Sequence, residues 1–134
     1  MDQNQSAQET TRLEKHLVAV LRELGYHAVE RSNNMIESST NGSKFSIFVQ
    51  QDGWLLFGLR LVNQFKFSLE KVNEFNRSYR FGKLCLDLEG DLYFSADMRV
   101  FLNSVSESFK DCVTLWDQLV GLLFRSLQPQ QASG

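Results

Sequence analysis

The stretch MIESSTNGSKFSIFVQQDGWLLFGLRL, residues 35–61, decides the fold. Asn41-Gly42 and Asp52-Gly53 divide it into three runs, and both dipeptides favour the positive-φ turns that join paired strands. Phe45, Ile47 and Val49 recur at every second position, which is typical of a strand with one face in the core. The stretch therefore predicts a three-stranded antiparallel meander, with strands at 35–39, 44–50 and 54–61. The third run is apolar on both faces, which predicts a central or doubly covered strand.

Helices are predicted on both sides of this meander. Before it, apolar residues recur every three to four positions and Gly25 follows them, so we expect a helix from about Ala7 to Leu24. After it, Ser68 is a suitable N-cap for a second helix that ends before Gly82. The apolar stripe of the first helix consists of Leu13, Leu17, Val20, Leu21 and Leu24.

A second hairpin is predicted beyond Gly82. Apolar side chains alternate through residues 84–89, Glu89-Gly90 supplies a turn, and the alternation resumes through residues 92–98.

The last predicted helix, from about Ser104 to Leu127, is apolar over more than one face. Such a helix is either deeply buried or shared with a second chain. In a domain this small we expect the second arrangement, a homodimer. For the same reason Trp116 has a stronger claim to an interface than Trp54. The predicted interface residues are Phe109, Trp116, Leu119 and Leu123.

The resulting order of elements is α-β-β-β-α-β-β-α. Because strands and helices do not alternate as βαβ units, we expect an α+β fold, in which an antiparallel sheet (three-stranded meander plus hairpin) is packed with helices. The chain has 134 residues, the length of one domain. We expect a single domain over residues 1–134 with an ordered core from about 7 to 127.

The composition is that of an ordinary globular domain, with 43% hydrophobic and 22% charged residues. The formal net charge of -2 provides no positive field for a phosphate backbone, so we expect no nucleic-acid partner. The polar N-terminus lacks a secretory signal, and the apolar runs at 54–57 and 119–124 are too short to span a bilayer. Two isolated cysteines, Cys85 and Cys112, suggest a reducing compartment and small core residues. We therefore expect a cytoplasmic protein without a membrane partner.

Stereotyped catalytic motifs are missing from the sequence: there is no phosphate loop, no GxGxxG after a strand and no GxSxG elbow. His16 and His27 belong to no metal-binding spacing. We therefore expect no catalytic residues, no metal and no cofactor.

The best carboxylate cluster is Asp87, Glu89, Asp91 and Asp97 in the second hairpin. It could hold a cation or supply a general acid and base. A solvated acidic sheet face, which discourages edge-to-edge aggregation, is the favoured interpretation. We expect the nearby cations Arg77, Arg80 and Lys83 to complement a helix dipole and to hold these acids.

Three strings resemble the bacterial YbjN-like family: VNEFN at 72–76, RFGKL at 80–84 and DLEGDL at 87–92. Members carry an N-x-W-N helix, an RFGK start to a strand and a D-x-x-GD hairpin, and Phe75 stands here where the family has tryptophan. The resemblance extends more loosely from Leu13 to Leu127. It implies a type III secretion chaperone-like fold that commonly dimerises, and a regulatory role in sensory transduction without an established enzymatic activity.

Together these observations favour a non-enzymatic protein-binding module, a chaperone-like or regulatory adaptor that acts as a homodimer on an unidentified protein client. We expect a client segment to lie against an exposed strand edge or an apolar groove. One alternative is a dedicated type III secretion or effector chaperone. Another, from a different class, is a small-ligand or metal-dependent enzyme that uses the hairpin carboxylates.

Overall fold

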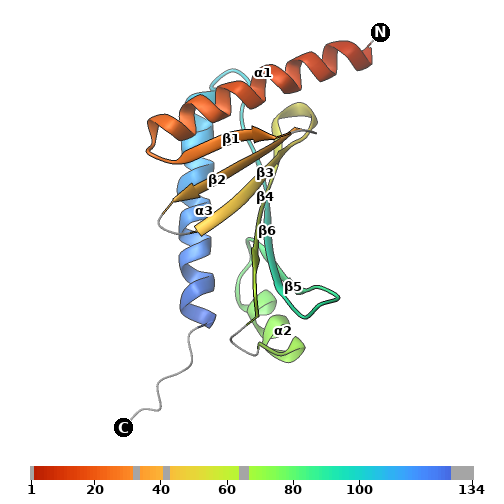
Figure 1. Ribbon diagram of the computed structural model, residues 1–134, viewed down its shortest axis with the longest axis vertical. Helices are drawn as coiled ribbons and strands as arrows, with labels where there is room; N and C mark the ends of the chain where they lie inside the picture. Colours follow the sequence, from red (N-terminus) through yellow and green to blue (C-terminus); the bar gives the residue numbers. More distant parts are fainter. Residues whose placement is uncertain (1, 32–33, 41–42, 64–66, 128–134) are drawn as a thin grey trace.

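The computed structural model describes residues 2–31, 34–40, 43–63 and 67–127. Within these ranges the chain forms an antiparallel sheet with strand order β1-β2-β3-β4-β6-β5 and a layer of helices (Figure 1). The elements are α1 (Asp2–Glu23), β1 (His27–Arg31), β2 (Met35–Thr40), β3 (Ser43–Val49), the short 3-10 helix η1 (Gln51–Gly53), β4 (Trp54–Leu61), α2 (Leu69–Ser78), β5 (Lys83–Leu86), β6 (Leu92–Arg99) and α3 (Val105–Leu127).

The predicted α+β class with an antiparallel sheet is confirmed, and one strand was missing from the prediction. β1 pairs antiparallel with β2, with Val29 opposite Glu37, so the order is α-β-β-β-β-α-β-β-α. Only Ala28 is fully buried in β1, at the side where it faces the helices. A five-residue strand with one buried side chain carries too little alternation to be recognised from its sequence.

The second predicted turn of the meander is confirmed. Asp52 and Gly53 have φ values of 60° and 82°, the left-handed conformation that this dipeptide favours. A side chain at Gly53 would also meet the carbonyl oxygen of Val100, because its Cβ would lie 2.4 Å from that atom. Asn41-Gly42 lies outside the described residues; the strands that flank it pair with Thr40 opposite Ser43.

Trp116 of α3 organises the core. Its ring lies 5.9 Å from Phe45, 5.3 Å from Phe57 and 5.5 Å from Phe94, measured between centroids. These phenylalanines come from β3, β4 and β6, which are successive strands in the sheet. One indole therefore holds α3 across the middle of the sheet, and it is 1% exposed.

The remaining helices are joined to this core at the two ends of the molecule (Figure 1). At one end α1 lies near the start of α3, where His16 hydrogen bonds Ser106. The Tyr26 hydroxyl, just beyond α1, donates to Asp117 in the middle of α3. At the other end Phe75 of α2 packs edge-on against Phe94. Burial, together with the Asp117 carboxylate, raises the pKa of Tyr26.

Glu14 is an acidic side chain buried on α1. Burial is the main cause of its raised pKa, and the nearby negative charge of Glu30 adds to it. The ionised carboxylate is therefore less favourable in the folded chain than in the unfolded chain.

We predict that Trp116→Ala lowers the free energy of unfolding by about 3–5 kcal/mol, because it leaves a cavity among three phenylalanines. Urea unfolding followed by circular dichroism measures this change. Thr114→Ala, at an exposed position two residues away, is the control and should change stability by less than about 0.5 kcal/mol. A Trp116→Ala protein as stable as the control would contradict the packing described above.

We predict that Glu14→Gln stabilises the protein at neutral pH and not under acidic conditions. Below the ordinary glutamate pKa the carboxyl is protonated in both states and contributes nothing; as the pH rises, the folded chain retains the proton longer and wild-type stability falls. The difference in unfolding free energy between variant and wild type should therefore grow with pH. Glu23→Gln, at the exposed end of the same helix, is the control. An equal gain at every pH would show that the charge of Glu14 is not the cause.

Candidate binding face

One face of the sheet points away from the helices. Its central row runs across all the strands of the described sheet, with the residues opposite one another in register. The row consists of Val29, Glu37, Ser46, Gly58, Ser95 and Lys83. On β3, Phe45, Ile47 and Val49 are buried beneath the helices, whereas Ser46 and Phe48 are only partly buried. We call this surface the open face.

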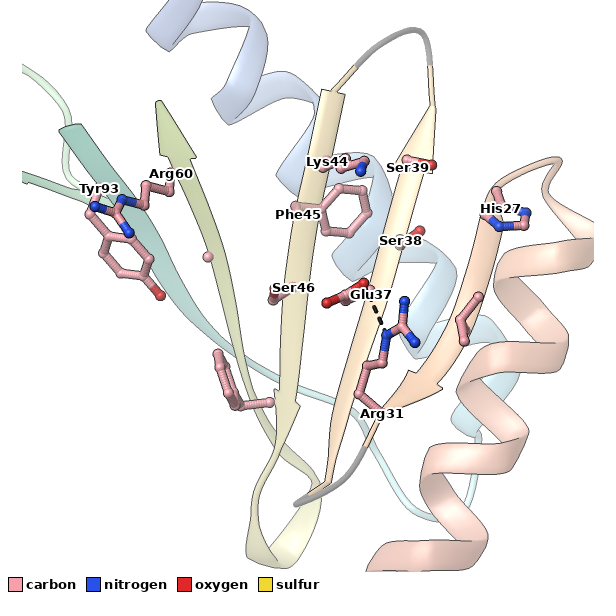
Figure 2. A pocket seen from close by; sticks show the side chains of 13 residues that line it. His27, Arg31, Glu37, Ser38, Ser39, Lys44, Phe45, Ser46, Arg60 and Tyr93 are labelled. Atoms are coloured by element: carbon pink, nitrogen blue, oxygen red, sulfur yellow. Dashed lines mark ion pairs between the residues drawn. The ribbon is translucent and has the colours of Figure 1, made fainter. Parts of the chain in front are cut away.

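A half-open hollow of about 450 Å³ lies on the open face (Figure 2). Gly58 of β4 is one of its lining residues, and a side chain there would collide with Tyr93, whose hydroxyl lies 2.2 Å from the position of a Cβ. Because Gly58 has no side chain, the Tyr93 ring can lie flat across β4. Ser46 forms a low floor beside the Tyr93 ring, which covers Gly58, and Phe48 and Tyr93 form apolar walls. A volume of this size is typical of ligand-binding sites.

Burial raises the pKa of the Tyr93 hydroxyl, with a smaller contribution from Cys85 on the neighbouring strand. Tyr93 thus presents a neutral hydroxyl to the hollow at physiological pH, able to donate a hydrogen bond.

Charged side chains surround the hollow unevenly. Arg31 of β1 forms an ion pair with Glu37 of β2 at 3.1 Å, so these charges offset each other. Lys44 of β3 is exposed and forms no ion pair with any residue that the structure describes. The side of the hollow near Lys44 is therefore positively charged.

Arg60, at the opposite side, is held by the second hairpin. Its guanidinium lies 3.2 Å from Asp87, 3.1 Å from Glu89 and 3.5 Å from Asp91. The Asp87 carboxylate also accepts hydrogen bonds from the backbone N–H groups of Glu89 and Asp91. The predicted carboxylate cluster thus stabilises a turn, while Asp97 lies elsewhere, opposite Leu56.

This arrangement corrects one expectation, since the cation that binds these acids is Arg60 and not Arg77, Arg80 or Lys83. Among the described residues, no group of three His, Cys, Asp or Glu side chains is placed to hold a metal ion.

Side chains bind the backbone at both edges of the sheet. At β1, the Arg22 guanidinium donates to the Ala28 carbonyl at 3.2 and 2.9 Å. At β5, the Asn76 side chain donates to the Leu84 carbonyl at 2.8 Å and accepts from the Leu84 N–H at 2.9 Å, as a paired strand would. Such contacts reduce the capacity of an edge to accept another strand. The expected docking on a strand edge is therefore disfavoured at these two positions.

The strings that resemble the YbjN-like family have structural roles here. Asn76 covers the edge of β5, and Asp87 and Gly90 shape the hairpin turn, where Gly90 has a φ of 83°. Gly82 has a φ of 86°, and a Cβ there would lie 2.5 Å from the Phe94 ring. These residues build the scaffold beside the hollow.

The residues predicted at a protein interface are all inside the core of the single chain. Phe109, Trp116, Leu119 and Leu123 are at most 5% exposed, because the wide apolar surface of α3 packs on the sheet. This corrects their assignment, since buried side chains cannot contact a second chain. Trp54, which we considered less suited to an interface than Trp116 on the basis of the sequence, is 44% exposed.

The two cysteines also differ. Cys112 is buried as expected, whereas Cys85 is exposed, and both are free thiols. The hollow itself was missed, because the contact between Gly58 and Tyr93 joins distant parts of the chain. A glycine in the middle of an otherwise apolar strand was the available signal, since it often marks a close approach.

A known protein family matches most of this chain. The model of the YbjN family, described as "Putative bacterial sensory transduction regulator", matches residues 15–129. The chain belongs to the YbjN family. The resemblance noted in the sequence is thereby confirmed over most of its length.

A solved structure shares the fold of this YbjN-family chain. It is a chain of the "Structure of the HopA1-SchA Chaperone-Effector Complex", with a TM-score of 0.56 and 14% sequence identity. The similarity covers 85% of this chain and 90% of that chain. The type III secretion chaperone-like fold is thus confirmed. A comparison with curated proteins gives no match. None of the described helices is long and apolar enough to cross a membrane.

We predict that Asn76→Ala lowers the free energy of unfolding by about 1–3 kcal/mol, because it leaves the backbone groups of Leu84 without their partner. Urea denaturation provides the measurement. Asn73→Ala, at an exposed position on the same helix, is the matched control and should change stability by less than about 0.5 kcal/mol. Equal stabilities for the two variants would show that Asn76 does not support the edge of β5.

Proposed function

We propose that this YbjN-family chain is a non-enzymatic protein-binding module, a chaperone-like or regulatory adaptor in the bacterial cytoplasm. The observation that carries the proposal is the one-sided sheet. Its helical side is closed by packing around Trp116, whereas its open face has a hollow with apolar walls. An accessible surface of this kind, with polar groups around it, is typical of interaction sites.

The similarities to the YbjN family and to the solved structure support a protein-binding role in general, without identifying a client. The family is described in terms of sensory-transduction regulation, and the structural neighbour is part of a chaperone-effector complex. A protein client suits both descriptions. The free thiols of Cys85 and Cys112 are compatible with the reducing cytoplasm.

A dedicated secretion or effector chaperone is the second candidate, favoured by the fold shared with a chaperone-effector complex. The two candidates differ in the number of clients, since a dedicated chaperone binds one effector and a regulatory adaptor binds signalling proteins.

The third alternative, an enzyme that uses the hairpin carboxylates, is not part of the proposal. Asp87, Glu89 and Asp91 already bind Arg60, and Asp87 also accepts two backbone hydrogen bonds. Carboxylates held in this way have a structural reason for their position.

Purification of the tagged chain from its native host, followed by mass spectrometry, tests the proposed function. A reproducible stoichiometric protein partner is the expected result. One partner that is itself secreted would favour the dedicated chaperone. Repeated isolation of the chain alone, under conditions where the tag is accessible, would count against a protein-binding role.

We also propose that the chain forms a homodimer through the outer side of α3. The four predicted residues are buried, but Leu115 and Leu122, seven positions apart on the same helix, are partly exposed. A spacing of seven residues places them on one line along the helix, as at a helix–helix interface.

We predict that Leu122→Glu shifts the sedimentation coefficient from dimer towards monomer, because it places a charge in the apolar contact. Thr114→Glu, at an exposed position on α3, introduces the same charge and should leave the dimer intact. A monomeric wild-type protein would rule out the homodimer. A dimer that withstands Leu122→Glu would exclude this side of the helix.

A further inference from the structure

The routes by which another polypeptide can bind this sheet are limited by the fold. The helical face is closed by α1, α2 and α3, whose apolar residues are buried against it. At the two edges, Arg22 binds the Ala28 carbonyl and Asn76 binds both backbone groups of Leu84. A strand added beside β1 or β5 would have to displace these side chains. The open face needs no such displacement.

The hollow on the open face has a shape that suits a side chain of a bound segment. Tyr93 covers Gly58, and the small side chain of Ser46, opposite Gly58 on β3, leaves a slot between Tyr93 and Phe48. Phe48 and the Tyr93 ring provide apolar surface at its sides, and both are partly buried. An apolar or aromatic side chain could therefore be buried there without any change in the core.

The charges around the slot indicate what should flank that side chain. Arg31 is offset by Glu37, and Figure 2 shows this pair across β1 and β2. Arg60 is held by three carboxylates of the hairpin. Lys44 is the cation of the hollow that forms no ion pair among the described residues. It is a ready partner for a carboxylate, although the whole chain has a net charge of -2.

We propose that the hollow on the open face binds an acidic segment of a client protein, with one apolar or aromatic side chain in the slot above Ser46, between Tyr93 and Phe48. A client carboxylate binds the Lys44 ammonium, and the apolar side chain packs against Tyr93 and Phe48. The half-open shape of the hollow lets the segment enter and leave across the sheet. This inference rests on the proposed protein-binding function and names the chemistry of the partner.

Fluorescence anisotropy with short fluorescein-labelled peptides tests the inference. Each peptide has one central phenylalanine, flanked by Asp and Glu, by Gln and Ser, or by Lys and Arg. We expect the acidic peptide to bind at least about tenfold more tightly than the basic one, a difference of about 1.4 kcal/mol. The preference should weaken with added salt, because salt screens exposed charges. Equal binding of the acidic and basic peptides would overturn the proposal.

Two variants locate the site. Lys44→Glu reverses the free charge, and Ser46→Phe fills the slot; both positions face away from the core. Each should reduce acidic-peptide affinity by at least about tenfold. Lys110→Glu, an exposed lysine on α3, makes the same charge change on the helical side and should bind as wild type. Urea unfolding confirms that each variant is folded. Unchanged affinity in both folded open-face variants would place the peptide elsewhere and overturn the proposal.

Two further measurements distinguish an acidic client segment in the hollow from a small ligand there and from a protein partner bound elsewhere. Phenylacetate that binds as tightly as the acidic peptide would assign the hollow to a small ligand and overturn the proposal. Native-host partners that remain bound to folded Lys44→Glu and Ser46→Phe proteins would also overturn it, while the protein-binding function would stand. A chain that binds the acidic peptide as expected but captures no partner would count against the adaptor function alone.

Discussion

The packing of Trp116 on Phe45, Phe57 and Phe94 is the contact on which the rest of the structure depends. Those three rings come from successive strands, so a single indole joins α3 to the centre of the sheet. Aromatic pairs at such distances contribute about 0.5–1.5 kcal/mol each beyond the burial of their surface. This contact also fixes which face of the sheet is covered. Every second residue of each strand must point towards the helical layer, and the residues between them must face the other way.

A sheet covered on one face has to protect its other boundaries. Exposed strand edges accept further strands, and a chain with two such edges is prone to aggregation. Arg22 and Asn76 address this at the two edges by binding backbone groups of Ala28 and Leu84. Arg60 and the acidic turn fix the second hairpin in a comparable way. As a consequence, side-chain contacts hinder strand addition at one position on each edge, whereas the open face stays accessible.

Local signals explain what could be predicted from the sequence. The Asp52-Gly53 turn, the Ser68 N-cap and the alternation of the β3 strand each depend on a few neighbouring residues, and the structure has all of them. The role of Trp116 could not be predicted in the same way. Hydrophobic burial has no direction, so a wide apolar helix is equally compatible with its own sheet or with a second chain. The hollow was missed for a related reason, since Gly58 and Tyr93 meet only through the pairing of β4 with β6.

The family motifs and the proposed binding chemistry reside in different residues of this chain. The strings at 72–76, 80–84 and 87–92 contain Asn76, Gly82 and Asp87, which shape β5 and its hairpin and would be costly to replace. Lys44 and Ser46 point out of the open face, where substitutions usually change stability by less than about 0.5 kcal/mol. The chemistry of the hollow can therefore change while the fold is preserved. It follows that the family motifs describe the scaffold, and that the proposed client binding depends on the side chains of the open face.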